Sequence, residues 1–268
     1  MPSADKRVLL ETTIQVDRCK MAMRRDRIDE MLKQFNIKVS TEFTLLEFKA
    51  VLIQECITIY NDLRQTKAYT SSRDRLVEST HPQHRLRSAI FNNIINVFAP
   101  SSFDVNPELN RELAEKACAL LDVHIPRFYR WFKNSVDGLL TPIGCDRAQE
   151  APTKKQVAYA ANLPICKSGK NKTCCVEAFI QSRSSTVIQK IAAAPTDSEQ
   201  LERAIEFIES VNSGAVTDIS HKQCRRVGDF LISMEGQGGV THAMSTNARD
   251  WKPLSEANGY EYVPVSYS

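Results

Sequence analysis

The stretch Gly228–Gly259, GDFLISMEGQGGVTHAMSTNARDWKPLSEANG, decides the expected fold. A helical pattern carries Asp229 and stops at a glycine-rich turn, and the aliphatic run Val240–Met244 then predicts a buried strand. Asp250 follows in the polar turn Ser245–Trp251, just past the carboxyl end of that strand. In open α/β sheets, sites form outside the carboxyl ends of the strands. The stretch therefore predicts an α/β fold in which two acids approach a site.

The N-terminal segment supplies a matching first strand. Arg7–Val16 (RVLLETTIQV) is rich in aliphatic and β-branched residues, as expected of a buried strand in a parallel sheet. Glu11 interrupts this run, and a carboxylate beside a buried run is costly unless it is paired, protonated or bound to a cation. Glu11 is thus a candidate site residue, the alternative being a solvated strand end. Asp17, at the far end of the run, is a second candidate for the same role.

A further acid lies on the next long helix. Ser40–Leu63 predicts a helix that begins at a capping Ser40 or Thr41 and is apolar on most of its faces. Glu47 lies inside this apolar surround, although its position also fits an exposed stripe of the helix. Before it, Ile37–Val39 fits a short second strand.

The middle of the chain is different in character and is mostly helical. We therefore expect residues 1–70 and 215–268 to form a doubly wound α/β core, and residues 71–214 to form a helical insertion. The patterns predict helices at Pro82–Phe98, at Pro107–Val136 (one helix, or two broken at Pro126) and at Thr196–Ser213.

A basic, loop-rich segment, residues 144–175, lies within the expected insertion. Such a run is either a solvated surface or a patch that contacts phosphates without reading sequence. Its candidate nucleic-acid-binding residues are Arg147, Lys154, Lys155, Lys167, Lys170 and Lys172.

Two other motifs have less support. Lys167–Thr173 (KSGKNKT) lacks the first glycine of a phosphate-binding loop, and no aliphatic strand leads into it. A zinc site would prefer closely spaced pairs of ligands, and the available cysteines are unevenly spaced. The residues considered for zinc are Cys145, Cys166, Cys174 and Cys175, with His221 and Cys224 needed to complete a set.

Composition bounds the class of protein. The 268 residues are 25% charged and 42% hydrophobic, as in ordinary globular proteins, and the net charge of +3 is too small to indicate nucleic-acid binding by itself. No apolar run approaches 18 residues, and no basic-then-apolar leader is present, so we expect no membrane span and a cytoplasmic protein. The eight cysteines do not indicate a disulfide scaffold.

The order of the acids resembles the PIN-domain nuclease family. An apolar-apolar-acid step ends the first strand at Glu11, and Glu47 follows on a helix. Asp229 opens a later helix, and Thr246, Asn247 and Asp250 form the turn after the next strand. The resemblance covers residues 7–65 and 221–265. Two features depart from the family: it usually has aspartate at the position of Glu11, and Glu47 and Asp229 are much farther apart here.

The resemblance implies a PIN-like three-layer α/β/α core and a metal-dependent endonuclease, acting on RNA rather than DNA. Glu11, Glu47, Asp229 and Asp250 would hold Mg²⁺ or Mn²⁺, hard cations that prefer oxygen ligands. Thr246 and Asn247 would orient this cluster or contact a phosphate. The alternative is a catalytically inactive PIN-like scaffold that binds nucleic acid, or a protein partner through its helical insertion. A zinc-stabilised nucleic-acid binder is a third reading.

Overall fold

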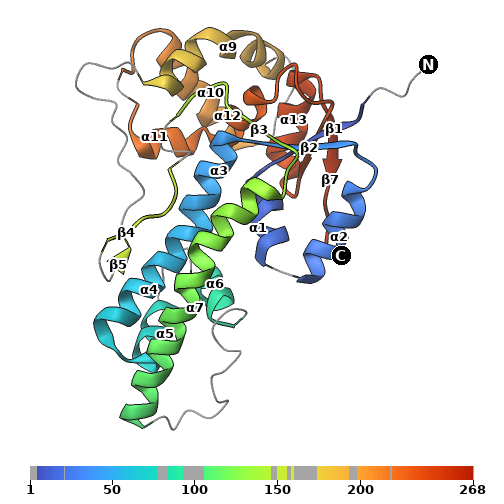
Figure 1. Ribbon diagram of the computed structural model, residues 1–268. Helices are drawn as coiled ribbons and strands as arrows, with labels where there is room; N and C mark the ends of the chain where they lie inside the picture. Colours follow the sequence, from blue (N-terminus) through green and yellow to red (C-terminus); the bar gives the residue numbers. More distant parts are fainter. Residues whose placement is uncertain are drawn as a thin grey trace. The chain divides into compact units, whose positions relative to one another are not determined.

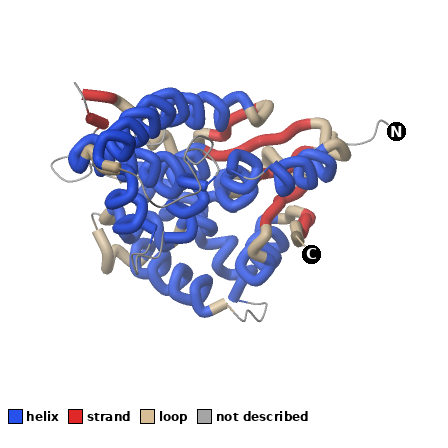
Figure 2. The backbone as a smooth tube through the Cα atoms, turned by 90° about the horizontal axis from the view of Figure 1, so that it is seen from below, coloured by secondary structure: helices blue, strands red, loops and turns tan. Residues whose placement is uncertain are grey.

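The computed structural model shows two compact units. The first comprises Met1–Glu47, Lys133–Glu150 and Pro164–Ser268, and the second comprises Phe48–Phe132 and Ala151–Leu163. Most of the described chain is helical (Figure 2). The described residues are 5–20, 22–77, 84–92, 106–145, 150–155, 158–159, 174–192, 198–217 and 219–267.

A five-stranded parallel sheet lies in the first unit, in the order β3-β2-β1-β6-β7. Figure 1 labels four of its strands, β1, β2, β3 and β7. The prediction of an α/β fold with a mostly parallel sheet is confirmed. The strands expected near residues 37–39 and 240–244 correspond to β2 and β6. The strands are β1 (Arg7–Leu10), β2 (Ile37–Thr41), β3 (Gly138–Leu140), β6 (His242–Ser245) and β7 (Glu261–Pro264).

Both faces of this sheet are covered, which explains the continuous apolar run in β1. Side chains alternate along a strand, so Leu9 enters one apolar cluster while Val8 and Leu10 enter another. The second cluster is completed by Ile28 and Leu32 of helix α2 (Ala22–Leu32). Strands buried on both faces lose the polar alternation of a half-exposed strand.

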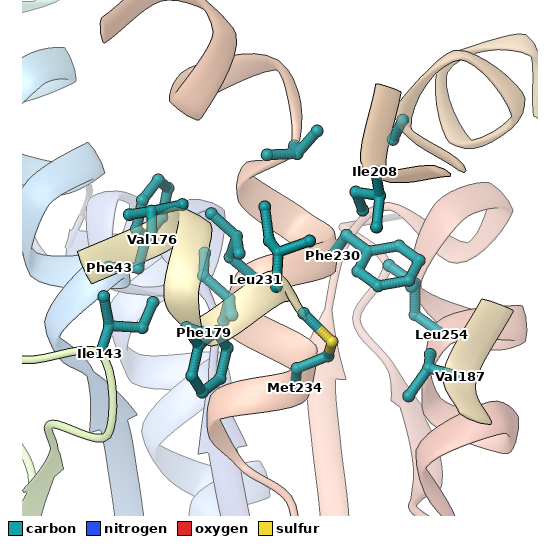
Figure 3. Close-up of a cluster of buried hydrophobic side chains, with 14 of the residues drawn as sticks. Phe43, Ile143, Val176, Phe179, Val187, Ile208, Phe230, Leu231, Met234 and Leu254 are labelled. Carbon is teal, nitrogen blue, oxygen red and sulfur yellow. The ribbon is translucent and has the colours of Figure 1, made fainter. Parts of the chain in front are cut away.

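The larger cluster is built around helix α12 (Gly228–Glu235). Figure 3 shows its Phe230, Leu231 and Met234 among side chains from the neighbouring helices, including Phe179 and Leu254. These neighbours are α3 (Glu42–Phe48), α9 (Cys175–Ala192), α10 (Glu199–Asn212) and α13 (Ala248–Asn258). At about 25 cal/mol per Å² of buried apolar surface, such a cluster is a main source of stability for this unit.

The boundaries of the two units differ from the expected core and insertion. Helices α9 and α10 fall inside the expected insertion 71–214, yet they belong to the first unit because their apolar faces complete its core. Residues 48–70, expected in the core, belong to the second unit instead. Periodicity shows that a helix has an apolar face, but it does not show against which unit that face packs.

The second unit is a group of helices with a small hairpin. Helix α7 lies alongside α4 (Figure 1), and Phe48 packs against Phe132 with ring centroids 5.0 Å apart. A buried ion pair joins Arg87 Nε to Glu55 Oε2 at 2.6 Å. Its elements are a π-helical turn (Lys49–Ile53), α4 (Gln54–Thr66), α5 (Tyr69–Val77), α6 (His84–Ile90), α7 (Pro107–Asn134), β4 (Lys154–Lys155) and β5 (Ala158–Tyr159).

The structure settles the extent or continuity of three predicted helices. The expected helix 40–63 is continuous through α3, the π-helical turn and α4, and Thr41 Oγ1 accepts a hydrogen bond from the Thr44 N–H at 3.0 Å, as a cap does. Pro126 does not break α7, where the buried Ile125 and Tyr129 on either side of it hold the helix by packing. The described part of the helix expected at 82–98 begins at His84. No helix among the described residues is long and apolar enough to span a bilayer.

The predicted strand 7–16 is wrong in length. β1 ends at Leu10, and helix α1 (Thr12–Lys20) begins two residues later. The reason is Glu11, whose carboxylate accepts hydrogen bonds from the Thr13 N–H at 2.7 Å and the Ile14 N–H at 3.3 Å. Backbone donors at the start of a helix need such acceptors, so the glutamate ends the strand and caps the helix.

Candidate functional site

The acids gather where the strand order of the sheet reverses. From β1 the chain builds outward to β2 and β3 on one side, and later to β6 and β7 on the other. The carboxyl ends of β1 and β6 therefore flank the switch point, where α/β folds place their ligands. Glu11 directly follows β1, and Thr246 directly follows β6.

Glu11 is buried rather than solvated, with 1% of its surface exposed. In addition to the two backbone N–H groups, the Thr13 hydroxyl donates to its carboxylate. Thr13 Oγ1 also lies 2.8 Å from Thr246 Oγ1, which links the turn after β1 to the turn after β6. The alternative of a solvated strand end is therefore wrong.

Glu47 reaches the same place from helix α3. Its Oε2 accepts a hydrogen bond from the Thr12 hydroxyl at 2.5 Å. Its Oε1 lies against Gly228, where an added Cβ atom would be only 1.8 Å away. The glycine thus lets the carboxylate of Glu47 rest on the first turn of α12, beside Asp229. The alternative of an exposed stripe is wrong for Glu47, which is mostly buried.

Asp250 occupies the first turn of α13, so the expected polar turn already becomes helical at Ala248. The carboxylate is buried, and both of its oxygens accept hydrogen bonds. Asn247 Nδ2 donates to Oδ2 at 2.6 Å, and the Ser198 hydroxyl donates to Oδ1. Ser198 also caps α10 by accepting from the Leu201 N–H at 3.1 Å. These contacts fit an orienting role for Asp250 better than direct contact with a ligand.

The electrostatics of the four acids show that they act on one another. Burial and the charge of Asp229 together raise the pKa of Glu11 to about 7 and that of Glu47 to about 8. Burial and the charge of Asp250 together raise the pKa of Asp229 to about 6. Like charges that approach each other in a buried site favour protonation. The four candidates therefore form one interacting group.

Trp251 closes this group on the side of Asp229. Its indole donor opposes the rise in the pKa of Asp229. The Nε1 atom is buried and yet reaches hydrogen-bond geometry with no acceptor in the described part of the chain. The indole N–H of Trp251 would form a stronger hydrogen bond with Asp229 when Asp229 is ionised.

The carboxylates are the right type of ligand for a hard cation, but they are not arranged as a ready binding site. Carboxylate oxygens are the ligands that Mg²⁺ and Mn²⁺ prefer. However, no three His, Cys, Asp or Glu side chains among the described residues are arranged so that they could hold a metal ion. Hydrogen bonds from threonine, serine and asparagine hold the carboxylates instead.

Sequence patterns did not reveal the residues that hold the acids in place: Thr12, Thr13, Ser198 and Gly228. Their only signals are local. Thr12 and Thr13 follow Glu11 directly, and Ser198 belongs to a capping pattern. Thr12, Ser198 and Gly228 act through contacts with residues distant in sequence, and a single sequence does not reveal such contacts. Only the contact of Thr13 with Glu11 is local.

Asp17, the second candidate in the first segment, lies outside the group. It is on α1, and Arg24 Nη1 lies 3.0 Å from each of its carboxylate oxygens. An arginine that contacts both oxygens satisfies the carboxylate, so Asp17 is held by its own ion pair.

The basic candidates are only partly described. In the second unit, Lys154 forms an ion pair with Asp122, and its Nζ lies 5.2 Å from the centroid of the Tyr60 ring. Its charge is thus already paired within the chain. Lys155 is in β4, and its side chain is not described. The remaining candidates, Arg147, Lys167, Lys170 and Lys172, lie outside the described residues.

The described cysteines do not assemble into the zinc set that was considered as an alternative. Cys174 and Cys224 are buried in the larger apolar cluster, and Cys145 packs against it. Cysteine often serves as a small apolar residue in such places. Cys166 lies outside the described residues.

Comparison of the chain with models of known protein families, with characterised proteins and with solved structures gave no match.

Proposed function

We propose that the protein is a metal-dependent, PIN-like endonuclease that hydrolyses phosphodiester bonds, most naturally in RNA. One observation supports this most directly. Glu11, Glu47 and Asp229, from distant parts of the sequence, interact electrostatically at the switch point of a parallel sheet, and burial and neighbouring charges raise the pKa of each. Unfavourable groupings of buried charge are typical of functional sites. The resemblance of the acid order to PIN nucleases supplies the reaction class.

The roles of the acids follow from their contacts. Glu11 and Asp229 are the proposed direct ligands of Mg²⁺ or Mn²⁺, and Glu47 lies beside them. A bound cation would supply positive charge for a phosphate and lower the pKa of a bound water. Asp250 and Asn247 keep the turn after β6 in place. Glu47, whose pKa burial and neighbouring charge raise to about 8, is suited to accept or donate a proton there.

A nuclease assay with and without Mn²⁺ tests this function. We expect cleavage of single-stranded RNA by the wild type that is abolished by EDTA, and a loss of about a hundredfold or more in Asp229→Asn. Glu256→Gln, which changes an exposed acid of α13, is the matched control and should retain activity. Equal cleavage by wild type and Asp229→Asn would show that the acids are not the site.

The inactive scaffold is the second candidate, and two observations favour it. The described acids do not form a ready three-ligand group, and both oxygens of Asp250 are already engaged within the chain. On this reading the fold binds nucleic acid or a protein without cleaving it. Binding of RNA without cleavage, equal in wild type and Asp229→Asn, would support it.

A further inference from the structure

A further buried acid, Glu42, lies outside the acidic group, directly after β2. Its Oε1 accepts a hydrogen bond from the Gly144 N–H, and its Oε2 accepts one from the Cys145 N–H at 3.1 Å. Gly144 has a φ of +68°, and a turn with such a residue can point successive N–H groups at one anion. Glu42 thus ties the turn after β3 to the start of α3.

A second buried acid, Glu235, lies beside this contact at the end of α12 and is 3% exposed. Its Oε2 accepts a hydrogen bond from the Phe43 N–H at 3.3 Å, so its carboxyl group lies against the peptide that follows Glu42. Its Oε1 is buried and has no hydrogen-bond partner in the described part of the chain. A buried carboxylate with one oxygen unsatisfied is costly, and a proton removes most of that cost.

The hydrogen bonds indicate which of the two acids carries the proton. Both oxygens of Glu42 accept from backbone N–H groups, which favours its ionised form. Burial raises the pKa of Glu235 well above its ordinary value, and the charges of Glu42 and Glu47 add to the rise. Hydrogen bonds from Thr41 and the Phe43 N–H oppose this rise without cancelling it. Glu235 is therefore the neutral partner of an ionised Glu42.

The two sides of this contact differ in how freely they can move. At the end of α12, a Cβ atom on Gly236 would lie 2.9 Å from the Tyr260 hydroxyl, so Glu235 is fixed in packed surroundings. That hydroxyl donates to the Ser233 carbonyl, and burial raises its pKa, so it adds no charge near Glu235. Gly144 is exposed, and a Cβ atom there would meet no described atom within 4 Å. The turn after β3, rather than the core helix, is the part that can yield.

We propose that Glu42 and Glu235 form a proton-controlled latch, which holds the turn after β3 in place while Glu235 keeps its proton. When Glu235 loses the proton to solvent, two buried carboxylates repel each other, and departure of the turn lets water reach both. The thiol of Cys145, which packs against the larger apolar cluster, moves with the turn. The turn also begins the basic segment 144–175, so the latch controls whether the start of that segment is fixed. This inference does not depend on the proposed function.

The sign of the pH dependence follows from the direction of the shift. Because the pKa of Glu235 is raised in the folded state, its contribution to stability is complete at low pH. That contribution is lost as the pH rises through the raised pKa. The latch is therefore closed at low pH and opens with rising pH.

The first test is amide hydrogen exchange of Gly144 and Cys145, followed by NMR from about pH 6 to about pH 9. We expect their protection in the wild type to fall about tenfold or more as the pH rises, after correction for the intrinsic exchange rate. Glu235→Gln mimics the protonated acid and cannot gain its charge, so both amides should stay protected. The Gln223 N–H, which the Ser220 hydroxyl holds, is the control amide and should not show this loss.

Two outcomes of this comparison would overturn the proposal. One is a pH dependence of protection that is the same in the wild type and Glu235→Gln, including no change in either. The other is weaker protection in Glu235→Gln at the lowest pH, which would show that Glu235 is already ionised there.

The second test removes the anion itself. Glu42→Gln leaves one carbonyl oxygen for two N–H groups, so protection of Gly144 and Cys145 should be about tenfold lower or more even at the lowest pH. Thermal unfolding of each variant shows that it is folded. Unchanged protection in folded Glu42→Gln would contradict the latch. If Glu42→Gln does not fold, the comparison of the wild type with Glu235→Gln still decides.

Discussion

Gly228, which has no side chain, determines how closely Glu47 approaches Asp229. A Cβ atom at position 228 would lie 1.8 Å from Glu47 Oε1 and 2.9 Å from its Cδ. No real pair of atoms tolerates this distance, and the flexible glutamate is the partner that would move. The glycine before Asp229 is therefore part of the site, although it carries no chemistry of its own.

We predict that Gly228→Ala uncouples Glu47 from the site without unfolding the protein. Displacement of a site group by about 1 Å lowers activity by a factor on the order of 100. Thermal unfolding should change little, because alanine is favourable in a helix. Gly239→Ala is the control, since its Cβ would meet nothing closer than 3.7 Å. Equal activity of the two variants, measured as RNA cleavage with Mn²⁺, would contradict this role of Gly228.

The hydroxyl of Thr12 controls the protonation of Glu47. Its hydrogen bond to the carboxylate lowers the pKa of Glu47, which burial and neighbouring charges otherwise raise. We therefore predict that Thr12→Val raises this pKa further above about 8, whereas Thr12→Ser leaves it near the wild-type value. Carboxyl-carbon NMR across a pH titration measures the effect. A pKa that is the same in the valine variant would show that the hydrogen bond does not hold the charge.

At the scale of elements, helix α10 and the site share one residue. Ser198 accepts a hydrogen bond from the backbone of α10 and donates one to Asp250 of α13. The start of α10 is thus fixed to the acidic group, and disturbance of one affects the other.

We predict that Ser198→Ala has two separable effects. Loss of the helix cap should reduce the free energy of unfolding by about 1 kcal/mol. Loss of the donor to Asp250 should also lower nuclease activity, by more than the fraction of unfolded protein explains. Ser198→Thr keeps a hydroxyl and should restore most of the activity. Chemical denaturation gives the first quantity and RNA cleavage the second; an alanine variant with full activity would rule out the link.

The elements that sequence patterns predicted well are those whose signal is local. The parallel strands β1, β2 and β6 are short apolar runs, and α10 begins after a capping pattern. By contrast, the helix within Arg7–Val16 was missed because β-branched residues favour a strand. Glu11 reverses that preference by capping α1 with its own carboxylate.

For the whole molecule, the order of the acids along the chain predicted one shared site, and in the structure Glu11, Glu47 and Asp229 lie within electrostatic reach of one another. The geometry among them was not predictable, because it depends on how α3 and α12 approach each other across Gly228. The assignment of α9 and α10 to the first unit was not predictable either, because it follows from packing between elements distant in sequence.

The acidic group also makes the stability of the protein depend on pH. Glu11, Glu47 and Asp229 have raised pKa values of about 7, 8 and 6, against ordinary values of 4.5, 4.5 and 3.8. At a pH between the ordinary and the raised pKa of each acid, the folded state binds more protons than the unfolded chain. The free energy of unfolding therefore falls as the pH rises through this range. The group titrates as a coupled set, so the loss extends from about pH 4 to about pH 8.

We therefore predict that, in EDTA, the Tm decreases between pH 5 and pH 8, because the folded state must then release the protons that its raised pKa values let it keep. Glu47→Gln removes one of the titrating charges and should flatten the decrease. Mn²⁺ should raise the Tm most at pH 8, where the carboxylates are ionised, and hardly at pH 5, because a cation that binds only the folded state stabilises it. Differential scanning fluorimetry across pH, with Glu256→Gln as the control for an exposed acid, measures both effects. A Tm that responds to Mn²⁺ equally in wild type and Glu47→Gln at pH 8 would place the cation away from Glu47.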